Sequence, residues 1–258
     1  MSGIQFRLVC ALEASAKGKR TAVAVGPTQR KDRRAFGMID LHMHTLLSDG
    51  ELIPTELARR FEVLGYRAIA FTDHVDTALV ETIVPVLVQV ARDLADAMEM
   101  TVLAGAEVTH CRLRHIGRVV DRARELGARI VVVHGETPSE PVIPGTNRAA
   151  IEAGCDILAH PGLLTEADAH LAAERGVLLE ISGRAGHSPT NGHVARTARQ
   201  AGAQVIFGSD THGVADLRPP GDAKKVLANA GLIEEEIGVA IAAAEALVAR
   251  ALEREESR

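Results

Sequence analysis

The feature that most constrains the fold is a regular alternation between short apolar segments and longer segments of helical composition. Seven segments are short, apolar and rich in β-branched residues: Met38–His42, Ala68–Thr72, Val102–Val108, Ile130–His134, Ile157–His160, Val177–Ile181 and Val205–Ser209. Continuous apolar composition is typical of parallel strands that helices cover on both faces. The alternation therefore predicts an α/β fold built on a parallel sheet.

Helices are expected between these strands, and several of them stop at a glycine. They are predicted over Pro54–Leu64, Thr82–Met98, Ile116–Leu126, Asn147–Ala153, Glu166–Arg175 and Gly192–Ala201. Gly65, Gly176 and Gly202 follow three of these helices, and glycine is the preferred residue just beyond a helix C-terminus. Seven strand–helix units predict a closed or nearly closed β/α barrel. An open, doubly wound sheet is the alternative.

The composition places limits on the compartment. The chain has 258 residues, of which 47% are hydrophobic, and it contains no Trp, so a large and mainly aliphatic core is expected. Cys10, Cys111 and Cys155 are far apart and form no C-x-x-C pair, which favours a reducing, cytoplasmic location. No apolar run reaches the roughly 20 residues needed to cross a membrane, so no membrane association is expected.

Charge divides the chain into two parts. Residues 1–37 carry a net charge of +6 against −5 for the whole chain, which leaves −11 for the remainder. We expect residues 1–37 to be a basic, poorly structured extension. A translation start at Met38 and a basic arm for nucleic acid are the other interpretations. Residues 38–258 are expected to form the functional domain, with C-terminal helices over 222–252 packed on the barrel. Its acidic, aromatic-poor composition disfavours nucleic-acid binding.

Residues of metal-ligand type gather where the predicted strands end. His42 and His44 are two residues apart at the end of the first strand, a spacing that points both imidazoles to one face. Later strand ends carry His74, Glu107, His134, His160, Glu180, Asp210 and His212. Left without a cation, such converging buried groups would cost roughly 1–3 kcal/mol each, so the pattern predicts a divalent metal site. His110, His115 and His170 lie outside the pattern and are expected at the surface.

On these residues the chain resembles the PHP superfamily, named for polymerases and histidinol phosphatases. The resemblance runs from Met38 to about Pro220 and rests on four motifs in order: His42-Met43-His44 with Ser48-Asp49-Gly50, Thr72-Asp73-His74, His134, and Ser209-Asp210-Thr211-His212. It implies a distorted (β/α)7 barrel, similar to a TIM barrel, that holds two or three divalent ions of Zn, Mn or Fe. Because no further domain accompanies it, the chain looks most like the stand-alone, histidinol-phosphatase-like branch.

The resemblance also implies which residues hold each ion. The first ion would be held by His42, His44, Glu107 and Asp210. The second would share Glu107 as a bridge and add His134 and His160. The third would be held by Asp49, His74 and His212. Some relatives have His at the position of Asp49, and a carboxylate there favours a harder metal such as Mn or Mg.

Several nitrogen- and oxygen-bound metals suit the hydrolysis of a phosphoester. We expect a metal-activated hydroxide to attack a small phosphomonoester, such as histidinol phosphate, with Glu107 as the bridging carboxylate and either Asp210 or His212 moving a proton. Arg184 is a candidate phosphate clamp, because guanidinium binds phosphate in a bidentate manner; otherwise it is a solvated loop residue. His187 is a candidate substrate contact. Glu180 either orients a ligand or fills the core.

The same residues are compatible with two other functions. A nuclease or phosphodiesterase would use the same metals, with the basic extension holding the strand. A non-catalytic metal-binding barrel is disfavoured because all nine expected ligand positions carry suitable residues. The sequence therefore favours a metal-dependent phosphatase, a hydrolase whose partner is a small phosphorylated metabolite.

Overall fold

A parallel sheet forms the centre of the computed structural model, which describes residues 37–256. Its strands are β1 (Ile39–Asp40), β2 (Ala68–Phe71), β3 (His74–Val75), β4 (Thr101–Val108), β5 (Ile130–His134), β6 (Ile157–Ala159), β7 (Leu178–Ser182) and β8 (Val205–Gly208). Seven of them pair in chain order, and the two-residue β3 pairs with β4 beside that path. Every pairing is parallel. The predicted α/β class is confirmed.

The first and last strands meet just beyond their hydrogen-bonded ends. Met43 and Thr211 form an isolated parallel bridge, in which the His44 N–H donates to the Thr211 carbonyl at 2.8 Å. The Asp210 N–H also donates to the His42 carbonyl at 3.0 Å. These contacts close the sheet into a nearly complete seven-stranded barrel, as predicted, and exclude the open sheet. The seam lies among the predicted ligands.

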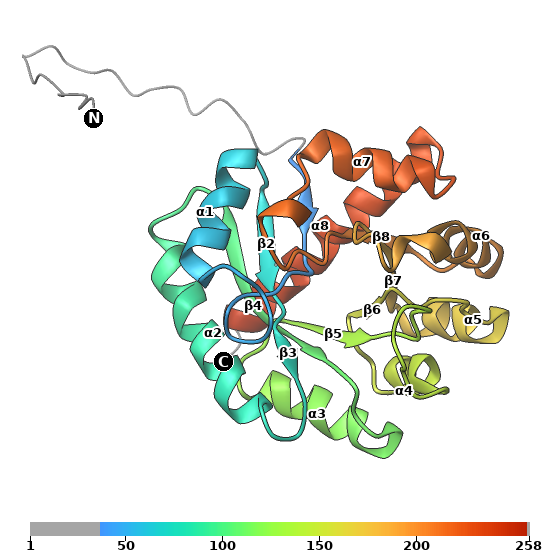
Figure 1. Cartoon of the computed structure of the whole chain (residues 1–258), viewed down its shortest axis with the longest axis horizontal. Coiled ribbons are helices and arrows are strands. Elements are labelled where there is room, and N and C mark those ends of the chain that lie inside the picture. The colour runs from blue at the N-terminus through green and yellow to red at the C-terminus, as the bar shows by residue number, and fades with distance from the viewer. Residues whose placement is uncertain (1–36, 257–258) are drawn as a thin grey trace, which may run out of the picture. The chain divides into compact units, whose positions relative to one another are not determined.

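Within residues 37–256, α-helices accompany the strands (Figure 1). They are α1 (Pro54–Leu64), α2 (Val80–Ala95), α3 (Leu113–Glu125), α4 (Thr146–Glu152), α5 (Glu166–Arg175), α6 (Asn191–Ala201), α7 (Pro220–Asn229) and α8 (Glu234–Glu256). Gly65, Gly176 and Gly202 have φ angles of 88°, 67° and 72°, a left-handed conformation that glycine adopts without strain. The bounds of α1 and α5 agree with prediction. The helices predicted over 222–252 are α7 and α8, separated near Gly231, whose φ is 93°.

Two apolar clusters hold the barrel together. The outer cluster packs side chains such as Phe61, Val84 and Ile116 from the helices against the outside of the sheet. The inner cluster joins Ile39 and Ile130 to Leu247 of α8, together with further strand residues. Helix α8 crosses behind the strands in Figure 1.

Ion pairs show which end of the barrel α8 covers. Arg67, directly before β2, pairs with Glu245 at 2.7 Å, and Asp156, directly before β6, pairs with Arg254 at 3.3 Å. Both strand residues lie where their strands begin. Helix α8 therefore closes the amino end of the barrel, and the carboxyl end remains for the site.

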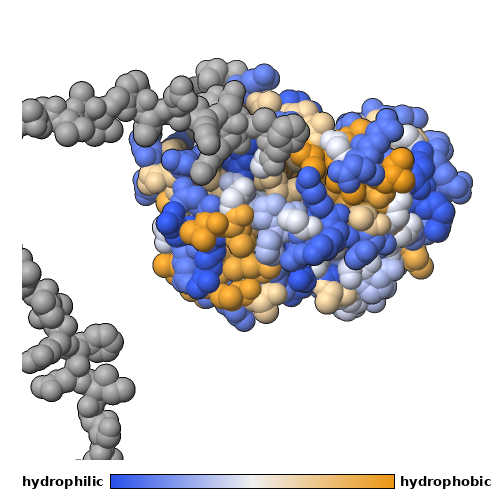
Figure 2. All heavy atoms as spheres, turned by 90° about the horizontal axis from the view of Figure 1, so that it is seen from above, coloured by the Kyte–Doolittle hydropathy of each residue, from blue (hydrophilic) through white to orange (hydrophobic). Residues whose placement is uncertain are grey.

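Other expectations concern the surface and the termini. Figure 2 shows one side of the molecule, on which hydrophilic residues are interspersed with small hydrophobic patches. Of the helices between residues 37 and 256, none has the length and apolar character that a membrane span requires. Cys111 and Cys155 are buried and free. The extension expected over residues 1–37 falls almost wholly outside the described residues.

Candidate metal centre

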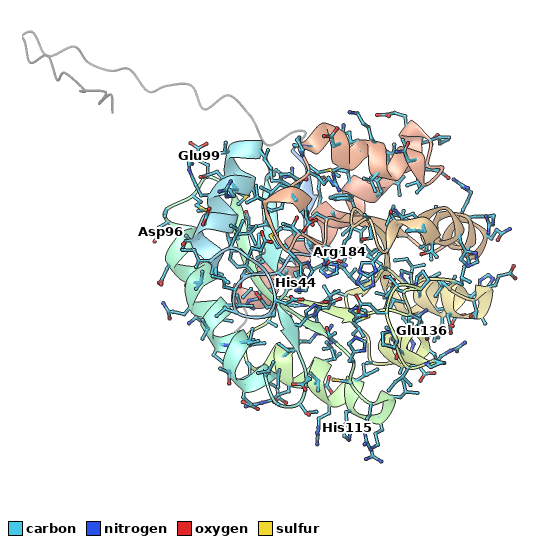
Figure 3. All side chains as sticks on the ribbon, in the orientation of Figure 1. His44, Asp96, Glu99, His115, Glu136 and Arg184 are labelled. Atoms are coloured by element: carbon cyan, nitrogen blue, oxygen red, sulfur yellow. The ribbon has the colours of Figure 1, made fainter. Side chains whose placement is uncertain are left out.

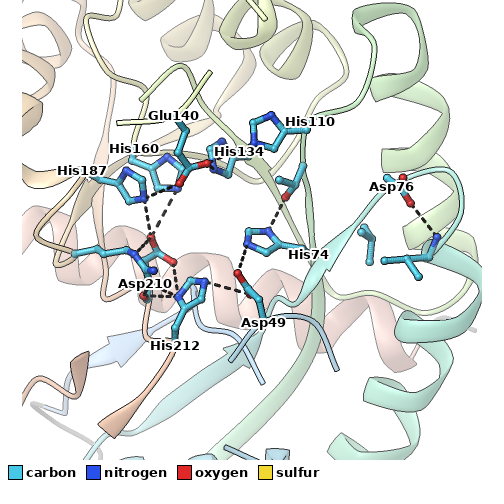
Figure 4. A pocket seen from close by; sticks show the side chains of 14 residues that line it. Asp49, His74, Asp76, His110, His134, Glu140, His160, His187, Asp210 and His212 are labelled. Carbon is cyan, nitrogen blue, oxygen red and sulfur yellow. Dashed lines mark hydrogen bonds and ion pairs between the residues drawn. The ribbon is translucent and has the colours of Figure 1, made fainter. Parts of the chain in front are cut away.

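The structure brings all nine predicted ligands together at the carboxyl end of the barrel. His42, His44 and Glu107 are fully buried. Above them, a cavity of about 370 Å³ is lined by Asp49, His74, His134, His160, Asp210 and His212, among others. Figure 3 places His44 and Arg184 centrally over the strands, and Figure 4 shows imidazoles and carboxylates from both sides pointing toward one another across this cavity.

The group predicted for the first ion lies at the barrel seam. The Nε2 atoms of His42 and His44 are 3.2 Å apart. His42 Nε2 lies 3.4 Å from Glu107 Oε1 and 3.8 Å from Asp210 Oδ1, and His44 Nε2 lies 3.3 Å from the same Asp210 oxygen. Two nitrogens and two carboxylates thus surround one point, the donor set that suits Mn²⁺ or Zn²⁺.

The group predicted for the second ion shares Glu107 with the first. Single donor atoms of Glu107, His134 and His160 lie within 4.8 Å of one another. His134 Nδ1 lies 3.1 Å from the Gly135 carbonyl, a contact that fixes the ring and leaves Nε2 to face the site. His160 and Asp210 have φ angles of 26° and 53°, and residues other than glycine rarely adopt such positive values. Such strain is concentrated at functional sites.

The group predicted for the third ion is more exposed. Asp49 lies 3.5 Å from His74 Nε2 and 3.2 Å from His212 Nε2, and a donor atom of His44 completes the cluster. The carboxylate of Asp73 accepts hydrogen bonds from the Thr45 and Ser48 N–H groups at 2.9 and 3.0 Å. Asp73 therefore anchors the loop that carries Asp49.

The buried carboxylates of the centre are paired with protonated imidazoles, and such carboxylates can also bind cations. Burial alone would raise the pKa of Glu107, but the positive charges of His42 and His74 hold it well below its usual range. Burial opposes the protonation of His74 as well, yet the Glu107 carboxylate raises its pKa to about 10. Protons on imidazoles thus compensate the buried carboxylates, and a bound cation would replace them.

Buried nitrogen and oxygen atoms that lack a hydrogen-bond partner support the same interpretation. Glu107 Oε1, His44 Nδ1 and His160 Nδ1 are buried without a hydrogen-bond partner among the described residues. Buried polar atoms rarely remain unpaired in native proteins. Burial also lowers the pKa of His44 to about 3, which keeps its imidazole neutral and able to bind a metal. The residues present therefore fit a multinuclear divalent-cation site.

Arg184 and His187 both line the cavity. Arg184 Nη1 donates to the Asp210 carbonyl at 3.1 Å and also contacts His212. His187 is buried; its Nε2 lies 3.3 Å from Asp210 Oδ2, and its ring stacks on that of His160 with centroids 4.0 Å apart. Both residues lie within reach of a ligand in the cavity.

Two residues at the site were assigned no role from the sequence. Glu140, in the loop after β5, lies 3.0 Å from His134 Nε2. His110 was expected at the surface; its side chain is 44% exposed, but it lines the cavity and lies 3.4 Å from Glu140. Neither ends a strand, so the strand-end pattern could not identify them. Three prolines around Glu140, at 138, 141 and 144, were the only local sign of a rigid loop.

Comparisons with known proteins agree with the family and the fold. The family model of the PHP domain matches residues 40–201. The uncharacterized protein MJ1295 of Methanocaldococcus jannaschii is 43% identical over 200 residues, which cover 77% of this chain and 92% of that protein.

Solved structures share the barrel at low sequence identity. The histidinol phosphate phosphatase of Lactococcus lactis, in complex with zinc, L-histidinol and phosphate, has a TM-score of 0.54 at 16% identity, covering 76% of this chain and 94% of that one. A chain of an archaeal ribonuclease P with mature tRNA has a TM-score of 0.65 at 15% identity, covering 84% and 91%. At such identities these likenesses show the fold alone.

Proposed function

The chain belongs to the PHP domain family, and from this premise we propose that it is a metal-dependent phosphoesterase acting on a small phosphomonoester. The observation that carries the proposal is that Glu107 lies between neighbouring ligand groups. Its two oxygens face His42 and His160 on one side and His44 and His74 on the other, at 2.7 to 3.6 Å. One carboxylate placed between several imidazoles is suited to hold neighbouring cations close together.

The proposed chemistry requires two or three divalent cations held by the nine ligands. Such cations, of Zn, Mn or Fe, would neutralise phosphate charge, acidify a coordinated water and stabilise the leaving oxygen. His42, His44 and Glu107 are buried beneath the cavity. Electrostatic interactions are stronger in such a low-dielectric setting than in bulk water.

The remaining roles go to residues that line the cavity. Arg184 is proposed to clamp the phosphate, because its guanidinium already lies against Asp210 and His212. His187 is proposed to contact the substrate beside His160. Asp210 and His212 both remain candidates for protonating the departing alcohol; their side chains lie 3.3 Å apart, so one can pass a proton to the other.

The test is elemental analysis of the purified protein together with a screen of phosphomonoesters and one phosphodiester, with and without Mn²⁺. We expect two or three metal ions per chain and Mn²⁺-stimulated release of phosphate from monoesters. His42→Ala should reduce turnover by more than the ~10–100-fold typical of losing a residue that only supports a ligand. His170→Ala, an exposed substitution on α5, is the matched control.

Three results would contradict the proposal. A protein without bound metal would show that the histidine cluster is not a metal centre. Full activity in His42→Ala would remove the assigned ligand set. Metal with turnover of the phosphodiester alone would favour a phosphodiesterase.

A further inference from the structure

A carboxylate that belongs to none of the three predicted ligand groups stands over the second one. Glu140 Oε2 lies 3.0 Å from His134 Nε2 and 3.4 Å from His110 Nε2, and its Oε1 lies 3.8 Å from His187 Nε2. Figure 4 shows Glu140 between His134, His160 and His187 at the edge of the cavity. His134 Nδ1 is already in contact with the Gly135 carbonyl. Glu140 therefore meets the one nitrogen of His134 that is free to bind a metal.

The loop around Glu140 is held on both sides. The Glu136 carboxylate accepts hydrogen bonds from the N–H groups of Gly145 and Asn147 at 3.0 and 2.9 Å. The Thr137 and Ser139 hydroxyls lie 2.6 and 2.9 Å from His187 Nδ1. Prolines at positions 138, 141 and 144 restrict the backbone further. The carboxylate is thus directed at the site by a pre-organised loop.

Its charge is at odds with a site for phosphate. A glutamate carboxylate is ordinarily an anion at neutral pH. Glu140 lines the cavity that a phosphate dianion must enter. Among the described residues the second ligand group holds Glu107, His134 and His160, and Glu140 forms a neighbouring donor group with His134 and His110. Three protein ligands leave a metal an open coordination position.

We propose that Glu140 is a displaceable fourth ligand of the second cation: it fills the open position when no substrate is bound and yields it to the incoming phosphate. This inference rests on the proposed function. A carboxylate and a phosphate oxygen are both hard, anionic oxygen donors, so either can occupy the position. The exchange keeps the cation coordinated between turnovers and makes Glu140 an internal competitor of phosphate.

The experiment compares Glu140→Gln with Asp76→Asn in the full-length protein. Asp76 lines the same cavity and its Oδ1 accepts the Ala78 and Leu79 N–H groups at 2.8 and 3.0 Å, contacts that an asparagine oxygen can keep. Both changes remove one negative charge, but only Glu140 touches His134. Calorimetric titrations with Mn²⁺, and then with inorganic phosphate on the Mn²⁺-loaded protein, give readouts that do not depend on turnover.

In Glu140→Gln we expect one Mn²⁺-binding step to weaken by on the order of tenfold or more. Inorganic phosphate should then bind the loaded variant about tenfold more tightly, because the competing ligand is gone. Asp76→Asn should change each constant by less than about twofold, because the Asp76 carboxylate is held by the Ala78 and Leu79 N–H groups. Melting temperatures measured alongside establish that both variants are folded.

Other results would overturn the inference. Unchanged Mn²⁺ binding, with phosphate tightened equally in both variants, would reduce Glu140 to a source of charge repulsion. Weaker phosphate binding in Glu140→Gln would make Glu140 part of the phosphate site. If the wild type binds Mn²⁺ but hydrolyses no monoester, the proposed function fails while these titrations still decide the role of Glu140. A wild type without Mn²⁺ would refute both.

Discussion

At the scale of single residues, Glu180 shows how the barrel interior orients a ligand. Its Oε2 lies 2.5 Å from His42 Nδ1, so that nitrogen carries the proton and Nε2 faces Glu107 and Asp210. The neighbouring strand β8 leaves space for this contact. A Cβ at Gly208 would lie 2.5 Å from Glu180 Oε2, so a larger residue there would displace the carboxylate. Of the two roles that the sequence left open for Glu180, the contact favours orientation of His42.

Glu180→Gln is therefore expected to weaken Mn²⁺ binding and to lower turnover by about 10–100-fold. A neutral amide accepts the Nδ1 hydrogen less strongly and no longer stabilises positive charge on the ring. Mn²⁺ titration and steady-state rates provide the measurement. Glu174→Gln, exposed on α5, is the charge-matched control and should behave as the wild type. Equal behaviour of the two variants would mean that Glu180 only fills space.

The same scale shows what the sequence could and could not reveal. Strand periodicity and strand ends located His42, Glu107 and His134, because the backbone itself directs those side chains. Glu140 could not be located, since its contacts with His110 and His187 join three separate loops. The left-handed backbone of His160 and Asp210 is likewise a tertiary effect, for no local preference of either residue demands it.

At the scale of elements, α8 acts as the closure of the barrel at the end opposite the metal centre. Leu247 is fully buried among strand residues of the inner cluster. Leu247→Ala should cost about 2–5 kcal/mol of unfolding free energy, because it leaves a cavity. In a domain of this size the melting temperature should fall by roughly 2–4 °C per kcal/mol.

The same substitution should leave the number of bound Mn²⁺ ions unchanged, because the metal centre lies at the carboxyl end. Leu252→Ala on the same helix, where the side chain is 40% exposed, should shift stability by less than about 0.5 kcal/mol. Loss of metal in Leu247→Ala would instead show that α8 controls the shape of the site.

The bounds of helices and strands were predictable where the apolar pattern ends at a capping residue, a proline or a glycine. They were less predictable where these residues are missing. Helices α1 and α5 agree with prediction because their ends carry clear signals. Pro54 is the first residue of α1, the Thr165 side chain caps the start of α5, and a glycine follows each helix. Strand β3, only two residues long, has too few positions to show a period. The helices predicted over 222–252 carried no boundary between them, because alanine-rich composition continues on both sides of Gly231. Helix formers surround Gly231, so composition alone does not reveal the boundary.

At the scale of the whole molecule, the closure formed by α8 and the predicted metal ligands lie at opposite ends of one barrel. Helix α8 packs on the inner cluster from the amino end, whereas the carboxyl end concentrates buried ionisable groups whose charges need compensation. Ions that bind only the folded chain stabilise it through mass action. The folded state of this domain should therefore depend on divalent cations.

Removal of metal with a chelator is expected to lower the melting temperature, and added Mn²⁺ to restore it. An ion present at 100 times its dissociation constant contributes about 2.7 kcal/mol, so two or three ions should shift the transition by several degrees each. Glu107→Gln should lose more of this gain than one ion contributes, since Glu107 Oε1 faces His42 of the first ligand group and His160 of the second. Scanning calorimetry at fixed Mn²⁺ measures the shift.

Leu247→Ala serves as the control for that measurement, because distant, independent changes add. It should lower the melting temperature with and without Mn²⁺ by similar amounts, and so preserve the gain that Glu107→Gln diminishes. If Glu107→Gln lost the share of a single ion, Glu107 would belong to one cation and the shared-ligand arrangement would be wrong. If the gain shrank equally in both variants, the two ends of the barrel would be energetically coupled, and the metal centre would depend on the closure formed by α8.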